Sequence, residues 1–276
     1  MRIIDAQIHC WPADINSREW QGGAVQTHWP RCSVEDVLAL LDREGVERAI
    51  LTPPPWSGWD AAYCMQAAHQ HPDRLAVVGL IDPTAPGAQV ALKSWHRPGM
   101  LGVRITPFRP PNNVVIDDPD YDWFWRIAAE IGLPVMAYYP GGMARMASVL
   151  QRYPYLRLIV CHAGLQASGG PVDEAAWADE RDLHALARYP GVAVKVSSLP
   201  NFSSQPYPFA NLHPHIRAIY DHFGPRRMFW GSDATRLAST YGENIRLFTE
   251  ALDFLSADDK AWIMGRAVAE HLGWQL

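Results

Sequence analysis

Short apolar runs recur along the whole chain and are separated by longer segments in which apolar residues have helical spacing. The runs fall at about residues 2–9, 46–51, 75–80, 100–105, 133–138, 157–161, 191–196 and 226–231. Between them, residues 120–131 place Trp123 and Ile127 on one helical face, and Ser33 precedes an apolar segment as a helix-capping residue would. Eight strands alternating with helices predict a single-domain (β/α)₈ barrel, a TIM barrel, over residues 1–276. A doubly wound open sheet is the alternative, but the sequence lacks the Gly-rich phosphate fingerprint typical of many such sheets.

Three of these apolar runs end in a side chain that can exchange protons: His9, His162 and Asp233. In a barrel of this kind the active site lies at the C-terminal ends of the strands, so we expect these side chains to meet. Gln7 and His9 are two residues apart on one strand, and both are expected to face the barrel axis. Further polar side chains at expected strand ends are Arg104, Tyr138, Lys195 and Ser197. A hydrogen-bonded structural role is the alternative for any one histidine, but three such residues at three strand ends favour a site.

Charge and composition narrow the class of partner. The 276 residues carry a formal net charge of -5 and a pI near 6.1, which argues against nucleic acid and anionic membranes and leaves a small molecule as the expected ligand. The sequence shows no signal-peptide pattern and no apolar run long enough to cross a bilayer, so we expect a cytoplasmic protein. Its four cysteines lack paired spacing, which favours reduced thiols over a disulfide framework or a zinc knuckle. A homo-oligomer is compatible with this composition.

The segments at the strand ends resemble the amidohydrolase-related family of the amidohydrolase superfamily from one end of the chain to the other. The matching segments are Ile4–His9, Gly102–Arg104, Leu133–Val135, Cys161–Gly164, Val194–Ser197 and Gly231–Asp233. The resemblance implies a distorted TIM barrel and, in most members, a hydrolase. Members usually bind a divalent metal through a His-x-His pair on the first strand, a residue of the fourth strand or a histidine of the fifth, and an aspartate on the eighth. Relatives include lactonases of sugar acids and of pyrone dicarboxylate, and a decarboxylase branch.

The chain departs from this family pattern at two metal-ligand positions. Gln7 stands where the first histidine of the pair is expected, and Tyr138 where the fifth strand often has a histidine. If a zinc or manganese ion is bound, His9, His162 and Asp233 are the ligands that remain. Glutamine is a poor zinc ligand and tyrosine a rare one, so function without a metal is favoured.

The resemblance and the residues together predict a hydrolase that opens a lactone or a related cyclic ester of a small organic acid. Asp233 is the candidate general base, and His9 and His162 polarise the carbonyl or protonate the leaving oxygen. Gln7 and Tyr138 add hydrogen bonds to the substrate. Arg104 suits a substrate carboxylate because its planar fork makes paired contacts, with a structural salt bridge as the alternative role.

Three other functions stay open at this stage. The chain could be a metal-dependent amide or ester hydrolase, or a non-oxidative decarboxylase of an aromatic acid. It could also be an inactive barrel that binds a small molecule or a partner subunit. Retention of His9, His162 and Asp233 at separate strand ends argues against the inactive barrel.

Three long segments are expected at the rim of the catalytic face, at about residues 10–32, 53–59 and 198–211. The first two are rich in tryptophan, and Trp56 and Trp59 are predicted to form aromatic walls for a flat or apolar substrate. A lid or a subunit contact is the alternative use of these tryptophans. Arg236, just after Asp233, is a candidate second contact for an anionic group, with an ordinary surface position as the alternative.

Overall fold

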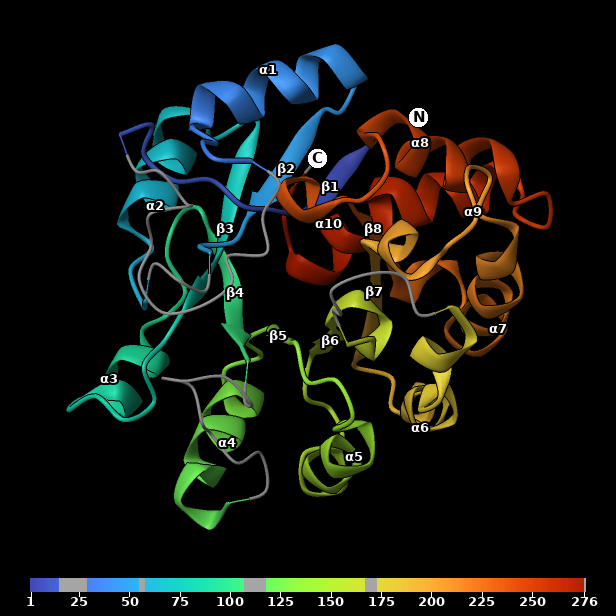
Figure 1. The fold of residues 1–276 in the computed structure, drawn as a ribbon. Coiled ribbons are helices and arrows are strands. Elements are labelled where there is room, and N and C mark those ends of the chain that lie inside the picture. Colours follow the sequence, from blue (N-terminus) through green and yellow to red (C-terminus); the bar gives the residue numbers. More distant parts are fainter. Residues whose placement is uncertain (15–28, 55–57, 107–117, 167–172, 276) are drawn as a thin grey trace.

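The computed structural model describes residues 1–14, 29–54, 58–106, 118–166 and 173–275. Eight parallel strands follow one another in chain order around a barrel, as the sequence predicts (Figure 1). They are β1 (Ile4–Ile8), β2 (Arg48–Leu51), β3 (Leu75–Leu80), β4 (Met100–Ile105), β5 (Val135–Ala137), β6 (Leu158–Val160), β7 (Val192–Ser197) and β8 (Met228–Gly231). The chain is therefore a single-domain TIM barrel, and each strand falls within or close to the expected apolar run.

Helices surround the strands and cover their outer faces (Figure 1). They are α1 (Val34–Glu44), α2 (Ala62–Gln70), α3 (Ala88–Lys93), α4 (Asp122–Glu130), α5 (Met143–Arg152), α6 (Glu180–Ala185), α7 (His213–Phe223), α8 (Tyr241–Arg246), α9 (Ala257–Ala261) and α10 (Ala267–Leu272). Helix α1 begins at a capping box, in which the Ser33 side chain accepts from Asp36 N and the Asp36 side chain accepts from Ser33 N. It ends at Gly45, whose φ of 70° is the left-handed conformation that glycine adopts readily. The chain therefore fixes both ends of this helix through local chemistry.

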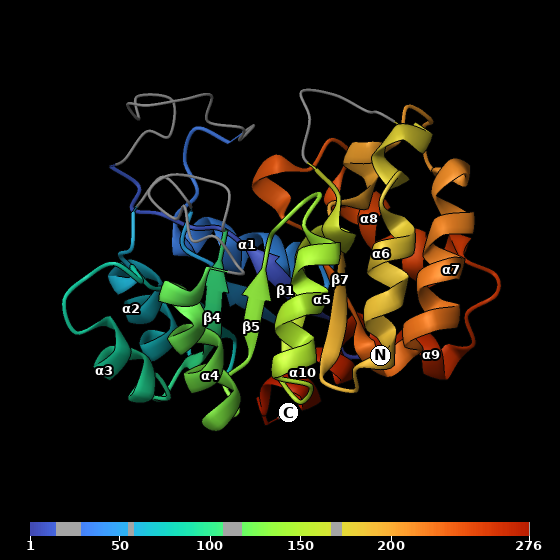
Figure 2. The same cartoon turned by 90° about the horizontal axis from the view of Figure 1, so that it is seen from below.

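Two apolar clusters hold the fold together. The larger one fills the space between the strands and the surrounding helices and includes Trp11, with Trp29 packed against it. The smaller one fills the barrel interior and is covered by α10. Its strand residues are Ile4, Ala6, Ile50, Val78, Met136, Ile159, Ala193 and Phe229. Figure 2 shows that β4 and β5 point away from the end of the barrel where α10 lies, so α10 closes the N-terminal ends of the strands.

The seam between β8 and β1 is drawn together at its C-terminal end. Asp233 N donates to Gln7 O over 2.9 Å, and Ser232 N donates to the Asp5 carboxylate over 2.8 Å. A Cβ atom at Gly231 would lie 3.1 Å from Gln7 N, so this glycine permits the close approach of the two strands. The seam brings the end of β8 against the end of β1, the two strands that supply Asp233 and His9.

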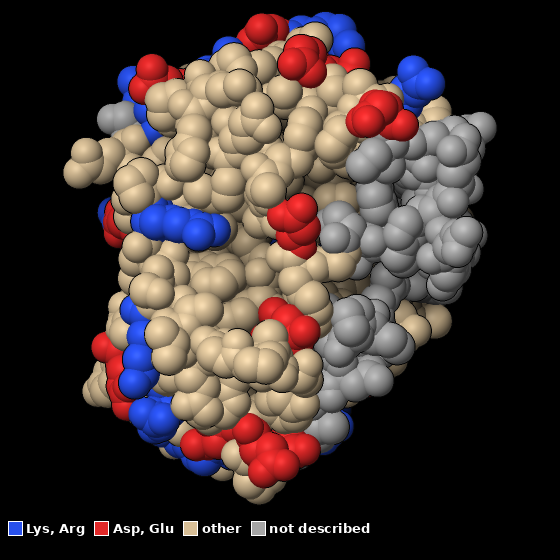
Figure 3. Space-filling view, turned by 90° about the vertical axis from the view of Figure 1, so that its left-hand side faces the viewer, with Lys and Arg blue, Asp and Glu red and all other residues tan. Residues whose placement is uncertain are grey.

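The surface carries charges of both signs, and the cysteines are not paired in disulfides. On the face shown in Figure 3, side chains of both signs lie interspersed among uncharged residues. Within the described residues, no helix is long and apolar enough to span a membrane. All four cysteines are free and buried, and Cys10 Sγ lies 3.8 Å from Cys64 Sγ.

Candidate active site

The end of β1 turns two polar side chains toward the barrel mouth. The pairing of β1 with β2 is irregular between Asp5 and Ile8, and such an irregularity re-aims the side chains that follow it. Ile4 and Ala6 fill the barrel interior, yet the Gln7 side chain also reaches inward to His162. Strict alternation would place Gln7 on the opposite face of the strand from Ile4 and Ala6.

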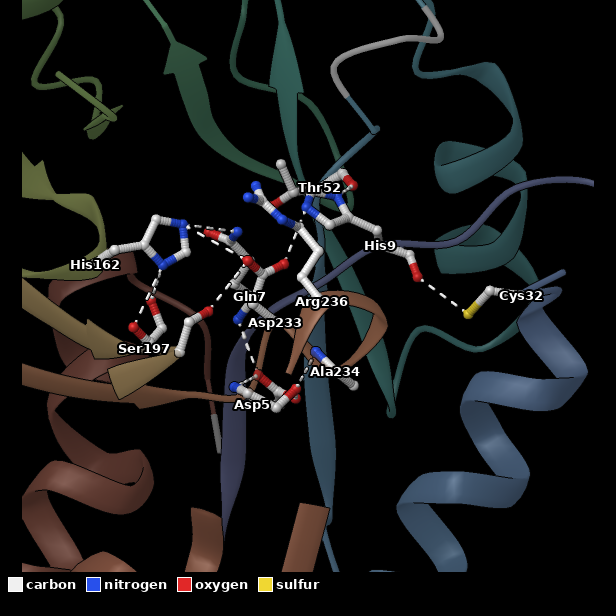
Figure 4. Close-up of polar contacts among 12 residues, drawn as sticks. Asp5, Gln7, His9, Cys32, Thr52, His162, Ser197, Asp233, Ala234 and Arg236 are labelled. Atoms are coloured by element: carbon white, nitrogen blue, oxygen red, sulfur yellow. Dashed lines mark hydrogen bonds and ion pairs between the residues drawn. The ribbon is translucent and has the colours of Figure 1, made fainter. Parts of the chain in front are cut away.

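Asp233 and His9 form a buried pair at the seam between β8 and β1 (Figure 4). His9 Nδ1 lies 2.7 Å from Thr52 O, and because a carbonyl oxygen only accepts, Nδ1 carries a hydrogen. His9 Nε2 lies 3.1 Å from Asp233 Oδ1, and both side chains are 4% exposed or less. The two side chains therefore form a close buried pair across the seam, although Asp233 Oδ1 has no hydrogen-bond partner of good geometry among the described residues.

Further contacts keep the Asp233 carboxylate ionised. Burial by itself raises the pKa of Asp233, but contact with His9 and the charge of Arg236 outweigh it and hold the pKa well below its usual value. Ser198 Oγ donates to Asp233 Oδ2 over 3.1 Å. Figure 4 shows the Arg236 side chain beside Asp233 and His9, which places this arginine at the site and not on an open surface. Asp233 is thus a carboxylate at neutral pH and is able to accept a proton.

His162 lies on the other side of Asp233. Its Nε2 is 3.3 Å from Gln7 Nε2 and 3.8 Å from Asp233 Oδ2, and its Nδ1 is 2.8 Å from Ser197 Oγ. The Tyr138 ring meets the imidazole edge to face, with centroids 5.1 Å apart. Burial lowers the pKa of His162 well below its usual value, against the opposing charge of Asp233. This histidine is therefore neutral and offers a lone pair on one nitrogen.

Arg104, at the end of β4, is 2% exposed, and its Nε and Nη1 atoms have no hydrogen-bond partner among the described residues. Its charge helps to lower the pKa of both His162 and Lys195, which places it close to the same cluster. The described residues supply no carboxylate partner, so the structural salt bridge considered from the sequence does not account for Arg104. A buried guanidinium with open donors is suited to an anionic ligand.

The backbone at three consecutive strand ends is left-handed at residues that are not glycine. His162, Ser198 and Asp233 follow β6, β7 and β8 and have φ values of 53°, 58° and 51°. Such conformations are costly for residues with a side chain and concentrate at functional sites. Each places a polar side chain over the barrel mouth at the point where the strand ends.

Asp5 anchors the seam from below and was not among the residues predicted for the site. It is fully buried and accepts hydrogen bonds from Gln7 N, Ser232 Oγ and Tyr241 Oη, besides the contact with Ser232 N. Burial raises its pKa, although these donors oppose the shift. The contacts of Asp5 fix the backbone on both sides of the Asp233–His9 pair.

The structure thus brings together most of the side chains that the sequence places at the site. A chain of contacts joins five of them, since His162 contacts Gln7, Tyr138 and Asp233, and Asp233 contacts His9. Arg104 and Arg236 lie beside this chain. Sequence reasoning missed Thr52, Ser198 and the contact of Lys195 with Gln7; their only signal was a polar residue in or just after an apolar strand.

The structure does not place the described tryptophans of the expected rim segments at the site. Trp56 lies outside the described residues, and Trp59 is half-buried. Trp11 is 2% exposed and packs in the larger apolar cluster, with Trp29 half-buried against it. At these two positions the tryptophans of the first expected rim segment contribute to packing.

A divalent cation held by His9, His162 and Asp233 needs lone pairs directed at one point. The lone pair of His162 Nε2 faces the Gln7 amide nitrogen instead, and the nearby cation Arg104 opposes a second positive charge. Among the described residues, no three His, Cys, Asp or Glu side chains form a metal-binding group. This donor set, as arranged, does not fit a resident divalent metal.

Comparison with known families agrees with this fold. The profile of the amidohydrolase family matches residues 4–272. The chain therefore belongs to the amidohydrolase family, which confirms the family and the class of enzyme predicted from the sequence.

Two curated proteins and a solved structure are similar to this chain. The chain is similar to an L-fucono-1,5-lactonase of Burkholderia ambifaria, with 27% identity over 87% of this chain and 83% of that protein. It is also similar to a 4-sulfomuconolactone hydrolase of Rhizobium radiobacter, with 24% identity over 74% of this chain and 66% of that protein. A crystal structure of an amidohydrolase from Burkholderia multivorans with bound zinc shares the fold, with a TM-score of 0.80, 22% identity and 99% coverage of both chains.

Proposed function

We propose that this protein hydrolyses a lactone of a small organic acid, with Asp233 as the general base. The observation that carries the proposal is the buried Asp233–His9 pair at the barrel mouth, with 3.1 Å between carboxylate and imidazole. Both curated relatives are named for the hydrolysis of a lactone, which supports this substrate class. A lactone is already electrophilic, so a base, a proton donor and an oxyanion contact suffice to open it.

The site residues divide the reaction between them. Asp233 takes a proton from a water molecule as the water oxygen attacks the lactone carbonyl carbon. The Gln7 amide N–H donates to the oxyanion that develops on the former carbonyl oxygen. As the ring C–O bond breaks, His9 Nε2 gives its proton to the leaving alkoxide. Asp233 then returns its proton to His9 across 3.1 Å, and the site regains its starting charge.

The same arrangement supports a reaction without a resident metal. One N–H of Gln7 faces the His162 nitrogen that a metal would need, and in this proposal the second N–H of the same amide supplies the oxyanion contact. We expect protein treated with a chelator to keep its lactonase activity within about twofold, because no step uses a metal. Loss of activity on chelation, with recovery on adding zinc or manganese, would show that the metal-dependent alternative is correct.

The open donors of Arg104 support a substrate with a second, anionic group. A carboxylate accepts both free donors of a buried guanidinium and removes the cost of leaving them unpaired. Arg236, beside Asp233, is the second candidate for such a contact. The proposed substrate class is therefore a lactone that carries a carboxylate.

Paired substrates test this assignment. The matched pair is a lactone with a free carboxylate and the same lactone with that carboxylate as a methyl ester. Arg104→Met should lower kcat/KM for the acid by about 10- to 100-fold, as expected for a lost charged hydrogen bond, and change the ester far less. Equal losses on both substrates would refute the role of Arg104 in binding the anion. Failure of a panel of acidic and neutral lactones to react at all would refute lactone hydrolysis itself.

A further inference from the structure

Lys195 is a cation inside the barrel that the reaction described above does not use. It lies on β7, and its side chain is fully buried. Its ammonium donates to Gln7 Oε1 in a short hydrogen bond and lies 3.5 Å from Met136 Sδ. Among the described residues, no carboxylate forms an ion pair with it. Burial of an ammonium among neutral partners is strongly unfavourable, and here burial also lowers the pKa of Lys195.

The contact with Gln7 fixes which end of the amide points where. An ammonium has three hydrogens and no lone pair, so only the oxygen of the Gln7 amide can face Lys195. The amide nitrogen then faces His162 Nε2, 3.3 Å away, and donates to it. Figure 4 shows Gln7 between His162 and Asp233, and we assign the second N–H of the amide to the substrate.

The other neighbours of Gln7 do not decide this orientation. His162 can accept at Nε2 in one tautomer and donate there in the other. Ser197 Oγ, 2.8 Å from His162 Nδ1, can follow either tautomer because a hydroxyl both donates and accepts. The backbone carbonyl Ser197 O, 3.4 Å from the same nitrogen, only accepts and therefore favours a hydrogen on Nδ1. Lys195 is the direct partner of Gln7 whose role is fixed by its chemistry, since an ammonium can only donate.

We propose that Lys195 is a positioning residue that holds the Gln7 amide with its N–H groups toward His162 and the substrate. It thereby acts together with Ser197 O, 3.4 Å from Nδ1, to favour the His162 tautomer with the hydrogen on Nδ1 and the lone pair on Nε2. A flipped amide would present its carbonyl oxygen to the developing oxyanion and repel it. The part of this proposal that concerns the oxyanion rests on the proposed lactone hydrolysis; the orientation of Gln7 and His162 does not.

A double-mutant cycle tests whether Lys195 acts through Gln7. Lys195→Met replaces the side chain by an unbranched one that is a single heavy atom shorter and removes its charge, and Gln7→Met removes the amide. Lys195→Met should lower kcat by about 100-fold with KM within about threefold, because the loss of one oxyanion donor has an effect of this size. In the Gln7→Met background, the same substitution should lower kcat by less than about threefold. Equal losses in both backgrounds would overturn the proposal, since Lys195 would then act independently of Gln7.

The matched control is Met136→Leu, which removes the sulfur next to the ammonium and keeps Gln7 and Lys195. Its activity should stay within about threefold of the wild type, because this exchange conserves volume. A loss as large as that of Lys195→Met would assign the effect to packing around the ammonium and overturn the proposal. Thermal unfolding of each variant shows whether it is folded.

A second readout needs no turnover. In chelator-treated protein labelled with ¹⁵N-histidine, His162 should show a protonated Nδ1 and an unprotonated Nε2. Lys195→Met should give a mixture of both tautomers. A wild-type His162 protonated on Nε2, or an unchanged tautomer in the variant, would overturn the proposal. If the tautomers are as stated but every lactone is inert, the proposed function fails while the role of Lys195 stands.

Discussion

The two ends of the barrel are buried to the same extent but are built from opposite kinds of side chain. The floor, on the side of α10, consists of apolar residues from the strands and from α10. The mouth, at the C-terminal ends of the strands, contains residues that are polar or charged and yet at most 4% exposed. Those residues are Gln7, His9, Arg104, His162, Lys195 and Asp233.

The apolar floor stabilises the fold, whereas the polar mouth contains features that lower its stability. Burial of apolar surface at the floor stabilises the barrel without leaving polar groups unpaired. At the mouth, two donors of Arg104 have no partner in the part of the chain that the structure describes, and three strand ends adopt left-handed conformations. Each of these features lowers stability, and features of this kind are retained where activity requires them. The contrast assigns stability to the floor and chemistry to the mouth.

Truncation of Phe229 should give the largest loss of stability. Phe229 is fully buried in the floor cluster on β8, with its ring centroid 5.2 Å from that of His271. We expect Phe229→Ala to lower the free energy of unfolding by about 3–5 kcal/mol, measured by urea denaturation, because it leaves a cavity in a packed interior. The kcat of the folded fraction should stay near that of the wild type. A large fall in kcat at full folding would break the division between the two ends.

Asp5 lies where floor and mouth meet, so its substitution should affect both properties. Asp5→Asn exchanges one carboxylate oxygen for a donor amide among Ser232 and Tyr241, whose hydroxyls donate to Asp5. The expected cost is about 1–3 kcal/mol of unfolding free energy, the usual penalty for a mismatched buried polar group. We also expect a lower kcat, because the Gln7 and Asp233 backbones lose their anchor. Loss of stability with unchanged kcat would confine Asp5 to the floor.

Two substitutions of Ser198 separate backbone strain from chemistry at the mouth. Ser198→Ala and Ser198→Gly both remove the hydrogen bond to Asp233, but only glycine relieves a φ of 58°. The glycine variant should be more stable than the alanine variant by about 1 kcal/mol, with equal activity. Differential scanning calorimetry and kcat for both variants check this. Equal stability of the two would show that the left-handed strand end carries no strain.

The smallest effect is expected at a site distant from both ends of this comparison. Glu243 completes the capping box of α8, and the hydrogen bonds from Thr240 N and Oγ1 lower its pKa. A lowered pKa contributes stability above the unfolded pKa and loses it as pH falls through the folded value. Glu243→Gln should therefore cost a few tenths of a kcal/mol at pH 7 and nothing at about pH 3. A constant difference between the two pH values would contradict this assignment.

The sequence predicts the floor and the class of fold well, because both depend on the period of apolar residues. All eight strands lie at or near the expected runs, since a buried strand needs such a run wherever it pairs. The helix cap at Ser33 follows from local chemistry and is confirmed. The expected boundaries of the rim segments stay predictions, because residues 15–28 and 55–57 of the first two segments lie outside the described residues.

The contacts at the mouth depend on three-dimensional features that a linear pattern does not contain. The irregularity in β1 allows Ala6 and Gln7, which are adjacent in sequence, both to face the barrel interior, and strict alternation does not predict this. In the sequence, Lys195 is a polar residue within an apolar strand and nothing links it to Gln7. The two residues are 188 positions apart and meet only when β1 and β7 come together in the barrel. His and Asp adopt left-handed conformations more often than most residues, but the great majority of them do not, so the residue type alone does not signal the conformations of His162 and Asp233.

The central claim is that Asp233 accepts the proton from the attacking water, and Asp233→Asn tests it most directly. The measurement is kcat/KM for a lactone that the wild type hydrolyses, with the unfolding temperature of each protein and with Asp221→Asn, a change in an exposed ion pair, as the control. We predict a loss of about 1000-fold for Asp233→Asn, near the middle of the range for general bases, with a cooperative unfolding transition retained. The control should stay within about twofold. Activity of a folded Asp233→Asn protein within about threefold of the wild type would contradict the account.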